Sequence, residues 1–225
     1  MGRVLLLLLL FLAMALAFHR AWLPPEWDPI QPLNLKAPRT PMTRLKLAWL
    51  QHDSERCLAA LQTSPLQWRV AQGLRAGQCP LSDAVRILGG PVATSPSSFL
   101  ASCRLAVDWS LFVTDAAQPE ALSAYGKSLR TVEHVGSYNC RDVRERPGAL
   151  SSHARADAID VSGFVLADGR RVLVSAWNDK GRDGVFLHAI RRSACRFFGI
   201  VLSPDYNALH AEHLHLEASN WALCR

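Results

Sequence analysis

Apolar residues follow a helical spacing through the first half of the chain, where they recur every three or four positions. We expect the last helix of this half to end before the β-branched residues that start at Thr131. Residues 43–130 are therefore predicted to be helical. The segments that carry the spacing are 44–51 (RLKLAWLQ), 55–62 (ERCLAALQ), 83–90 (DAVRILGG), 99–113 and 117–129.

Short runs typical of β-strands replace the helical spacing after residue 131. The residues ADGR at 167–170 lie between two such runs and predict a hairpin turn. Residues 184–198 predict an amphipathic helix, and 200–202 a short strand. The order predicts an α+β fold, in which the helical N-terminal portion packs on one face of a small antiparallel sheet. The runs are 131–135 (TVEHV), 158–166 (AIDVSGFVL), 170–177 (RRVLVSAW) and 213–219 (HLHLEAS).

The N-terminus carries one long apolar segment. Arg3 is followed by fifteen apolar residues at positions 4–18, fewer than the roughly 20 that span a bilayer. Small residues at 15 and 17 favour a cleaved signal peptide, whereas Trp22 and Trp27 favour a retained anchor with aromatic residues at the membrane interface. Both alternatives stay open for residues 1–21. In either case we expect a periplasmic protein, held at the inner membrane if the segment is uncleaved and secreted if it is removed.

The next segment, residues 22–42, contains six prolines and predicts an extended tether. The remaining residues, 43–225, then form one domain of ordinary size. The chain has a formal net charge of +6, but the basic residues are scattered and no dense cluster is visible. With an exported location, this distribution argues against nucleic acid as a partner.

Six cysteines predict disulfide bonds. Their number is even and no pair shows the Cys-x-x-Cys spacing of a metal site, so an exported chain can form up to three bridges. Several connectivities are compatible with the sequence. We expect Cys195–Cys224 to be one bridge, because it would fix the C-terminus to the domain. A catalytic cysteine is the less favoured alternative.

Candidate chemistry begins at residues 151–160 (SSHARADAID). His153 and Asp160 are seven positions apart and would face opposite sides of one straight strand. They can converge if His153 lies on a turn and Asp160 on the strand that follows. A carboxylate among apolar neighbours needs a partner, which could be a metal ion or a set of backbone donors.

A second candidate segment is 210–217 (HAEHLHLE). On a strand, His213 and His215 share one face, and the leucines between and after them pack into the core on the other face. Two imidazoles side by side can supply one zinc ligand and one group that handles protons. Two surface histidines are the alternative reading.

Together, His153, Asp160 and His215 form a set of two histidines and one carboxylate. Such a set suits Zn²⁺, with a fourth position for water, and predicts metal-assisted amide hydrolysis. His213 is the expected base, and Glu212 replaces it if the strand bulges. Two further catalytic candidates are His210, as a partner near the reacting group, and Arg141, which could bind a carboxylate or an oxyanion unless it is an ordinary surface residue.

These segments resemble the extensin-like C-terminal family of bacterial exported proteins. The resemblance covers roughly residues 43–225. It rests on residues 136–141 (GSYNCR), 151–164 (SSHARADAIDVSGF), 194–198 (ACRFF), 202–216 (LSPDYNALHAEHLHL) and the closing 224–225 (CR).

That family is in turn similar to zinc peptidases of the lysostaphin, D-Ala-D-Ala peptidase and hedgehog group. Their pattern Ser-x-His-x-x-Gly-x-Ala-x-Asp matches this chain at both ligand positions and departs at the glycine, where Ala156 stands. The segment 210–215 is similar to the His-x-x-His-x-His ending of murein endopeptidases. It also fits the Glu-x-x-His ending of the dipeptidases, so the relatives agree on His215 as a ligand and differ on the base.

The resemblance implies that peptidoglycan stem peptides are the substrate, and it places Arg141 near the substrate carbonyl. A non-catalytic, zinc-stabilised scaffold or binding module of the cell wall is the alternative that the resemblance also allows.

Overall fold

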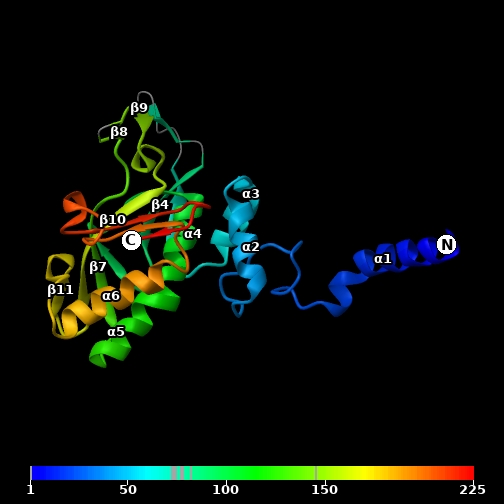
Figure 1. The fold of residues 1–225 in the computed structure, drawn as a ribbon, viewed down its shortest axis with the longest axis horizontal. Helices are drawn as coiled ribbons and strands as arrows, with labels where there is room; N and C mark the ends of the chain where they lie inside the picture. Colours follow the sequence, from blue (N-terminus) through cyan, green and yellow to red (C-terminus); the bar gives the residue numbers. More distant parts are fainter. Residues whose placement is uncertain (1, 72–74, 77–78, 82, 145) are drawn as a thin grey trace.

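A computed structural model describes residues 2–71, 75–76, 79–81, 83–144 and 146–225, and shows a domain preceded by a long helix (Figure 1). That helix, α1 (Gly2–Trp22), is largely exposed along its length. Its first eighteen residues, 2–19, are long and apolar enough to cross a membrane, with a mean hydropathy of 2.2. The predicted N-terminal apolar segment is thus confirmed as a helix, which is compatible with both a signal peptide and an anchor.

Residues between α1 and the domain pack more closely than the sequence predicted. Leu33 and Leu35 are buried in the main hydrophobic cluster. The ammonium group of Lys46, on α2 (Pro41–Leu50), donates a hydrogen bond to the Pro25 carbonyl at 2.7 Å. The prediction of an unpacked tether is therefore wrong for residues 33–35, because these two leucines bury their side chains in the hydrophobic cluster of the domain.

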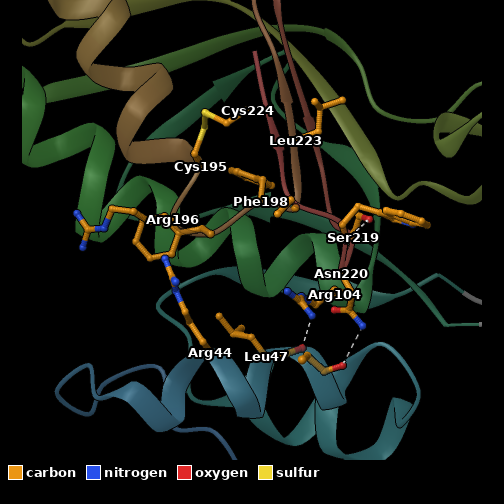
Figure 2. A pocket seen from close by; sticks show the side chains of 15 residues that line it. Arg44, Leu47, Arg104, Cys195, Arg196, Phe198, Ser219, Asn220, Leu223 and Cys224 are labelled. Atoms are coloured by element: carbon orange, nitrogen blue, oxygen red, sulfur yellow. Dashed lines mark hydrogen bonds between the residues drawn. A yellow bond between two sulfur atoms is a disulfide. The ribbon is translucent and has the colours of Figure 1, made fainter.

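Two hydrogen bonds link the backbone of α2 to later segments of the domain (Figure 2). The guanidinium of Arg104 donates to the Leu47 carbonyl, and the Asn220 amide donates to the Ala48 carbonyl at 3.5 Å. The next helix, α3 (Ser54–Gln62), is capped by Asp53, whose side chain accepts from the Arg56 amide.

A small antiparallel sheet occupies part of the region that was predicted to be helical. Its strands β1 (Gln67–Val70), β4 (Ala84–Gly89) and β6 (Phe99–Ser102) pair in the order β1-β4-β6. The helix predicted at 83–90 is therefore wrong. Val85 and Ile87 are buried while Leu88 is exposed, which fits the alternation of a strand better than a helical face.

Helix α4 (Cys103–Phe112) starts directly after β6 and is buried at all ten positions. A short π-helical segment (Val113–Ala117) and α5 (Gln118–Tyr125) continue it, until Gly126 ends the helix with φ at +65°. The predicted helix at 99–113 thus begins four residues late. Uniform burial explains the error, because a continuous apolar run shows neither the 3.6-residue period of a helix nor the two-residue period of a strand.

The main sheet has seven strands in the order β14-β12-β13-β10-β7-β5, with β11 paired to β10. Most pairs are antiparallel, but β5–β7 and β12–β14 are parallel, so the prediction of a purely antiparallel sheet is wrong in those two places. The fold is mixed α and β, as predicted. Its strands are β5 (Ala93–Ser95), β7 (Leu129–Gly136), β10 (Ala158–Leu166), β11 (Arg171–Leu173), β12 (Ile200–Leu202), β13 (Leu214–Glu217) and β14 (Leu223–Cys224).

Shorter elements complete the domain. The hairpin of β8 (Asp142–Val143) and β9 (Arg146–Leu150) projects away from the helices (Figure 1). Helix α6 (Arg182–Ala194) forms where an amphipathic helix was predicted. Three short 3₁₀ segments are η2 (Ser152–Arg155), η3 (Val174–Ala176) and η4 (Ala208–His210).

The helices cover one face of the main sheet. Phe164 of β10 packs edge-to-face on Phe186 of α6, with ring centroids 5.4 Å apart. Leu214 and Leu216 of β13 are fully buried in the same hydrophobic cluster. Because side chains alternate along a strand, the residues between them point to the opposite face. That face is free to hold polar groups.

Three disulfide bonds connect the cysteines. Cys195–Cys224 confirms the predicted bridge and joins the end of α6 to β14. Cys57–Cys103 joins α3 to α4, and Cys79–Cys140 joins β3 (Cys79–Pro80) to the loop after β7. The bridges support an extracytoplasmic location, since disulfides persist mainly in oxidising compartments.

Ala156, which ends the turn η2, has φ at +56° and ψ at 29°. This left-handed conformation costs a residue with a Cβ about 1–2 kcal/mol. Ala154 in the same turn is equally buried and has no positive φ. We expect Ala156→Gly to be more stable than Ala154→Gly by about 1–2 kcal/mol in denaturant unfolding, because both lose a buried methyl and only the first relieves strain. Equal stabilities of the two variants would contradict this account.

Candidate metal centre

Two neighbouring strands place a carboxylate and an imidazole opposite each other. In the antiparallel pair β10–β13, Asp160 is the register partner of His215. Both side chains lie on the face of the sheet that the helices leave free, because Leu214 and Leu216 fill the other side. The predicted alternation of this segment is confirmed.

His153 approaches the pair from the turn η2, as the sequence predicted. The side chain of Ser151 caps this turn and accepts a hydrogen bond from the His153 amide at 3.3 Å. The His153 carbonyl accepts from the Asn139 amide at 3.1 Å, next to the bridge Cys79–Cys140. Hydrogen bonds at the first residue of the turn and at the His153 carbonyl thus fix the direction of the His153 imidazole.

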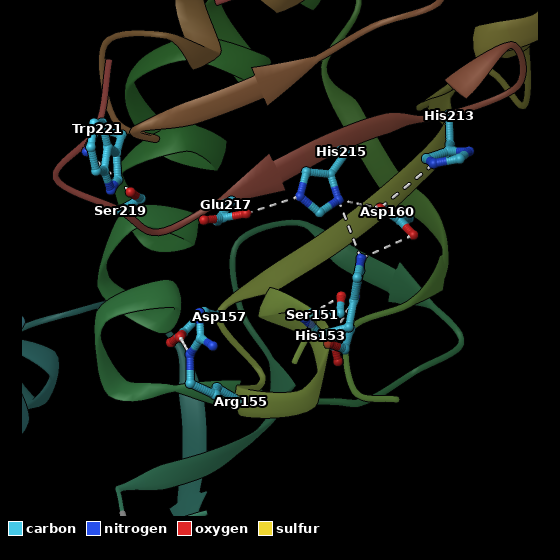
Figure 3. Close-up of polar contacts among 11 residues, drawn as sticks. Ser151, His153, Arg155, Asp157, Asp160, His213, His215, Glu217, Ser219 and Trp221 are labelled. Carbon is cyan, nitrogen blue, oxygen red and sulfur yellow. Dashed lines mark hydrogen bonds and ion pairs between the residues drawn. The ribbon is translucent and has the colours of Figure 1, made fainter. Parts of the chain in front are cut away.

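The three side chains meet in one cluster (Figure 3). Nε2 of His153 lies 3.2 Å from Nδ1 of His215 and 3.3 Å from Oδ2 of Asp160. Nδ1 of His215 lies 3.0 Å from Oδ1 of Asp160. All three donor atoms fall within 4.8 Å of one another. The three residues that the sequence analysis grouped as a candidate set therefore lie close together in the structure.

Hydrogen bonds on the outer side of each ring orient both imidazoles. Nδ1 of His153 lies 3.1 Å from the Ser137 carbonyl, which can only accept, so this nitrogen carries the proton. Nε2 of His215 lies 3.3 Å from a carboxylate oxygen of Glu217 and carries a proton for the same reason. The remaining nitrogens point at each other and at Asp160. Two lone pairs at 3.2 Å repel, so a proton or a cation must lie between them.

The charges of the cluster favour a cation at this point. Burial disfavours the ionised carboxylate of Asp160, but its interactions with the imidazoles of His153 and His215 outweigh this effect and hold the pKa of Asp160 well below its usual range. Burial also disfavours an imidazolium, yet the hydrogen bonds to Asp160 and Glu217 raise the pKa of His215 to about 9. Without metal, the cluster therefore keeps a proton on His215. The same position suits a divalent ion, with nitrogen and oxygen donors of the kind that Zn²⁺ prefers.

His213 and His210 lie beside the cluster without joining the three donors. Nε2 of His213 is 3.7 Å from Oδ1 of Asp160, and the rings of His210 and His213 are 5.2 Å apart. Burial lowers the pKa of His213, and burial together with His213 and His215 lowers the pKa of His210 to about 4. Both side chains are therefore neutral at pH 7 and can accept a proton.

Glu212 and Arg141, which the sequence suggested as catalytic residues, lie outside these contacts. Glu212 is exposed on the turn before β13, and no described contact joins it to the cluster. The Arg141 guanidinium donates to the Asp142 carbonyl at 3.1 Å, while its own carbonyl accepts from the Ser151 amide. The backbone of Arg141 thus supports the turn, and its side chain forms a hydrogen bond at the start of β8.

Two other residues contribute to the site and were missed. Glu217 orients His215, and alternation could have revealed it, since positions 213, 215 and 217 share one face of a strand. Arg144, between β8 and β9, is the arginine whose charge acts on His210 and His213. Only the fold of the hairpin brings it there, so no local pattern could have identified it.

Comparison with known proteins gives one match. A family model described as the C-terminus of extensin-like proteins matches residues 55–225, about three quarters of the chain, and includes every residue of the cluster. No curated protein and no solved structure matches the chain.

Replacing the carboxylate behind His215 tests the orientation of this ligand. We expect Glu217→Gln to weaken zinc binding about 10- to 100-fold, because the neutral amide removes the negative charge that holds the His215 proton on Nε2 and makes the ring a stronger ligand. The measurement is zinc competition with a chelating dye on the full chain in detergent. Glu133→Gln is the matched control, since Glu133 pairs with the exposed Arg171 on another part of the sheet. Equal affinities of the two variants would refute the role of Glu217.

Zinc affinity should also depend on pH. The pKa of His215 is raised to about 9 without metal, so below that pH the ion must displace a proton from its nitrogen. We expect the apparent affinity to fall about tenfold for each pH unit between about pH 8 and about pH 6, as release of one proton requires. The same dye competition, repeated across this range, measures the slope. A flat profile would show that His215 is not protonated in the metal-free protein.

Proposed function

The chain belongs to the extensin-like C-terminal family, and on this premise we propose that it is a zinc-dependent hydrolase of peptide bonds in peptidoglycan. The observation that carries the proposal is the cluster of His153, Asp160 and His215, in which two inward nitrogens and a carboxylate surround a point that favours positive charge. Neutral histidines beside this cluster supply groups that can move protons.

The donor set supports zinc. His153 and His215 would hold the ion through Nε2 and Nδ1, and Asp160 through its carboxylate. The Ser137 carbonyl and Glu217 support both rings from behind, as outer partners do in zinc sites. When bound, zinc would polarise the carbonyl of the scissile amide and lower the pKa of a water molecule.

His213 is the residue best placed to accept a proton during hydrolysis. Its lowered pKa keeps the imidazole neutral, and its Nε2 lies 3.7 Å from Asp160, at the edge of the donor cluster. Its side chain is partly exposed, so a substrate can reach it. His210 is held by Asn207, 2.7 Å from its Nδ1, and lies next to His213 as a second neutral imidazole.

The surroundings of the cluster support a substrate that carries carboxylates. Arg144 acts on His210 and His213 from the β8–β9 hairpin, whose described residues are exposed. A guanidinium at the rim of a site binds carboxylates well, because its donors match both oxygens. Stem peptides of peptidoglycan carry free carboxylates. The apolar N-terminal helix and the three disulfides support a location where such peptides occur.

Two histidine variants separate metal binding from catalysis. We expect His213→Ala to retain about one zinc per chain and to lose cleavage of muropeptides by a factor of about 100 or more, as loss of a general base requires. His215→Ala should lose both zinc and cleavage, because it removes a ligand. Zinc content is measured by atomic absorption, and products by chromatography of digested muropeptides.

The control is His52→Ala, which replaces an exposed histidine at the end of α2 and should match the unmodified chain. Zinc bound by the unmodified chain without cleavage of any muropeptide would refute the enzyme and favour a zinc-stabilised scaffold of the cell wall. Cleavage that survives in His215→Ala would refute the metal site.

A further inference from the structure

The exposed side chain of Asn207 has two partners at the start of η4. Its Oδ1 accepts a hydrogen bond from the Leu209 amide at 3.0 Å, which caps this short helix. The same oxygen lies 2.7 Å from Nδ1 of His210. A backbone N–H can only donate, so the atom that faces Leu209 is the oxygen of the Asn207 amide group. His210 therefore meets an acceptor.

This contact determines which ring nitrogen of His210 carries the proton. An amide oxygen only accepts, so Nδ1 of His210 is the donor. The imidazole is neutral at pH 7, because burial together with His213 and His215 lowers its pKa to about 4. A neutral imidazole carries one proton, and with that proton on Nδ1 the other nitrogen, Nε2, keeps its lone pair. His210 can therefore accept a proton only at Nε2.

The His210 ring lies among other rings of the site. Its centroid is 5.6 Å from that of Tyr206, 5.2 Å from that of His213 and 6.0 Å from that of His215. Rotation of the ring by half a turn would move Nδ1 away from Asn207 and lose the hydrogen bond at 2.7 Å. Asn207 thus selects one of the two ring orientations as well as the position of the proton.

The segment that leads into Asn207 is tied to the body of the domain at two points. The amide and the hydroxyl of Ser203 both donate to the carbonyl oxygen of Arg225, at 2.9 and 2.8 Å. The indole Nε1–H of Trp177 donates to the carboxylate of Asp205 at 2.7 Å. These bonds limit the movement of the backbone before Asn207, so its side chain keeps its place beside His210.

We propose that Asn207 is a positioning residue for the proposed hydrolysis. It holds the proton of His210 on Nδ1, so that Nε2 is free to take a proton from a reacting group at the metal centre. A third group that orients a histidine base and fixes its tautomer is a recurrent arrangement in hydrolases. The inference rests on the proposed function and gives His210 a defined part in it, beside His213.

A serine at position 207 separates this role from the capping of η4. Serine caps helices about as well as asparagine, but its oxygen is one bond closer to the backbone and would not reach His210. An aspartate keeps both the cap and the acceptor. Asn207→Ser should therefore lose only the contact with the imidazole, and Asn207→Asp should keep it.

The tautomer is measured by ¹⁵N NMR of the histidine rings, on the metal-free full chain in detergent, with His210→Gln to assign the signals. We expect the proton of His210 on Nδ1 in the unmodified chain. In Asn207→Ser, the ratio of the Nδ1–H form to the Nε2–H form should fall about fivefold, the contribution of one hydrogen bond. Asn207→Asp should restore the Nδ1–H form at about pH 8, where the imidazole stays neutral.

Cleavage of muropeptides by the zinc-loaded chain gives the second readout. We expect kcat to fall about fivefold in Asn207→Ser, in step with the tautomer ratio, while KM and the zinc content stay unchanged. Asn207→Asp should keep most of the activity. The matched control is Asn34→Ser, because Oδ1 of Asn34 accepts from the Lys36 amide at 2.9 Å with the same spacing as Asn207 and Leu209. It should match the unmodified chain in both measurements.

A proton on Nε2 of His210 in the unmodified chain, or an unchanged ratio in Asn207→Ser, would overturn the role of Asn207 and leave the hydrolase standing. Full cleavage by Asn207→Ser despite a changed ratio would do the same, because the tautomer would then not matter. If the unmodified chain shows the expected tautomer and cleaves no muropeptide, the hydrolase itself fails, and the role of Asn207 in catalysis fails with it.

Discussion

The pairing of Asp160 with His215 is the interaction on which the site depends. A carboxylate that is largely removed from water is stable only with a partner of positive charge or with several donors. The register of β10 and β13 places the imidazole of His215 directly across from it, 3.0 Å away. The same register sends Leu214 and Leu216 into the core, so a slip by one residue would lose both the site and the packing. The packing of the core and the geometry of the site therefore require the same register of β10 and β13.

The site was largely predictable because its residues obey local rules. The alternation of residues 213–217 fixes which side chains share a face, and the polar turn before β10 explains how His153 and Asp160 can meet. The positions of His213 and Arg144 were harder to predict, since both depend on where loops lie. The charge of Arg144 acts on His210 and His213 only because the β8–β9 hairpin brings it near them, whereas the guanidinium of Arg141 donates to the Asp142 carbonyl. Three positions in sequence separate the two, and periodicity cannot decide between them.

The errors in the fold have two different causes. Residues 84–89 and 99–102 are strands in a region of helices, and their apolar residues are dense enough to fit either period. The packing of residues 33–35 was missed for the opposite reason, because prolines suggest an extended chain and say nothing about the leucines between them. Local spacing thus predicts elements well only where one face remains polar. Where tertiary contacts bury both faces of a segment, the spacing of its apolar residues does not distinguish a helix from a strand, and those contacts determine which one forms.

The two halves of the site differ in how firmly they are held. His153 is fixed by the Ser151 cap, the Ser137 carbonyl and a loop that Cys79–Cys140 ties to the first half of the domain. His210, in contrast, lies on an exposed turn before β13, and His213 lies between that turn and the strand. Rigid donors keep three atoms within 4.8 Å, which a metal requires because its affinity depends on preset distances. Residues that exchange protons with a substrate must be reachable, and greater exposure provides that access. Under the proposed function, the buried strands and the braced turn would hold the metal, and the more exposed turn would exchange protons with the substrate.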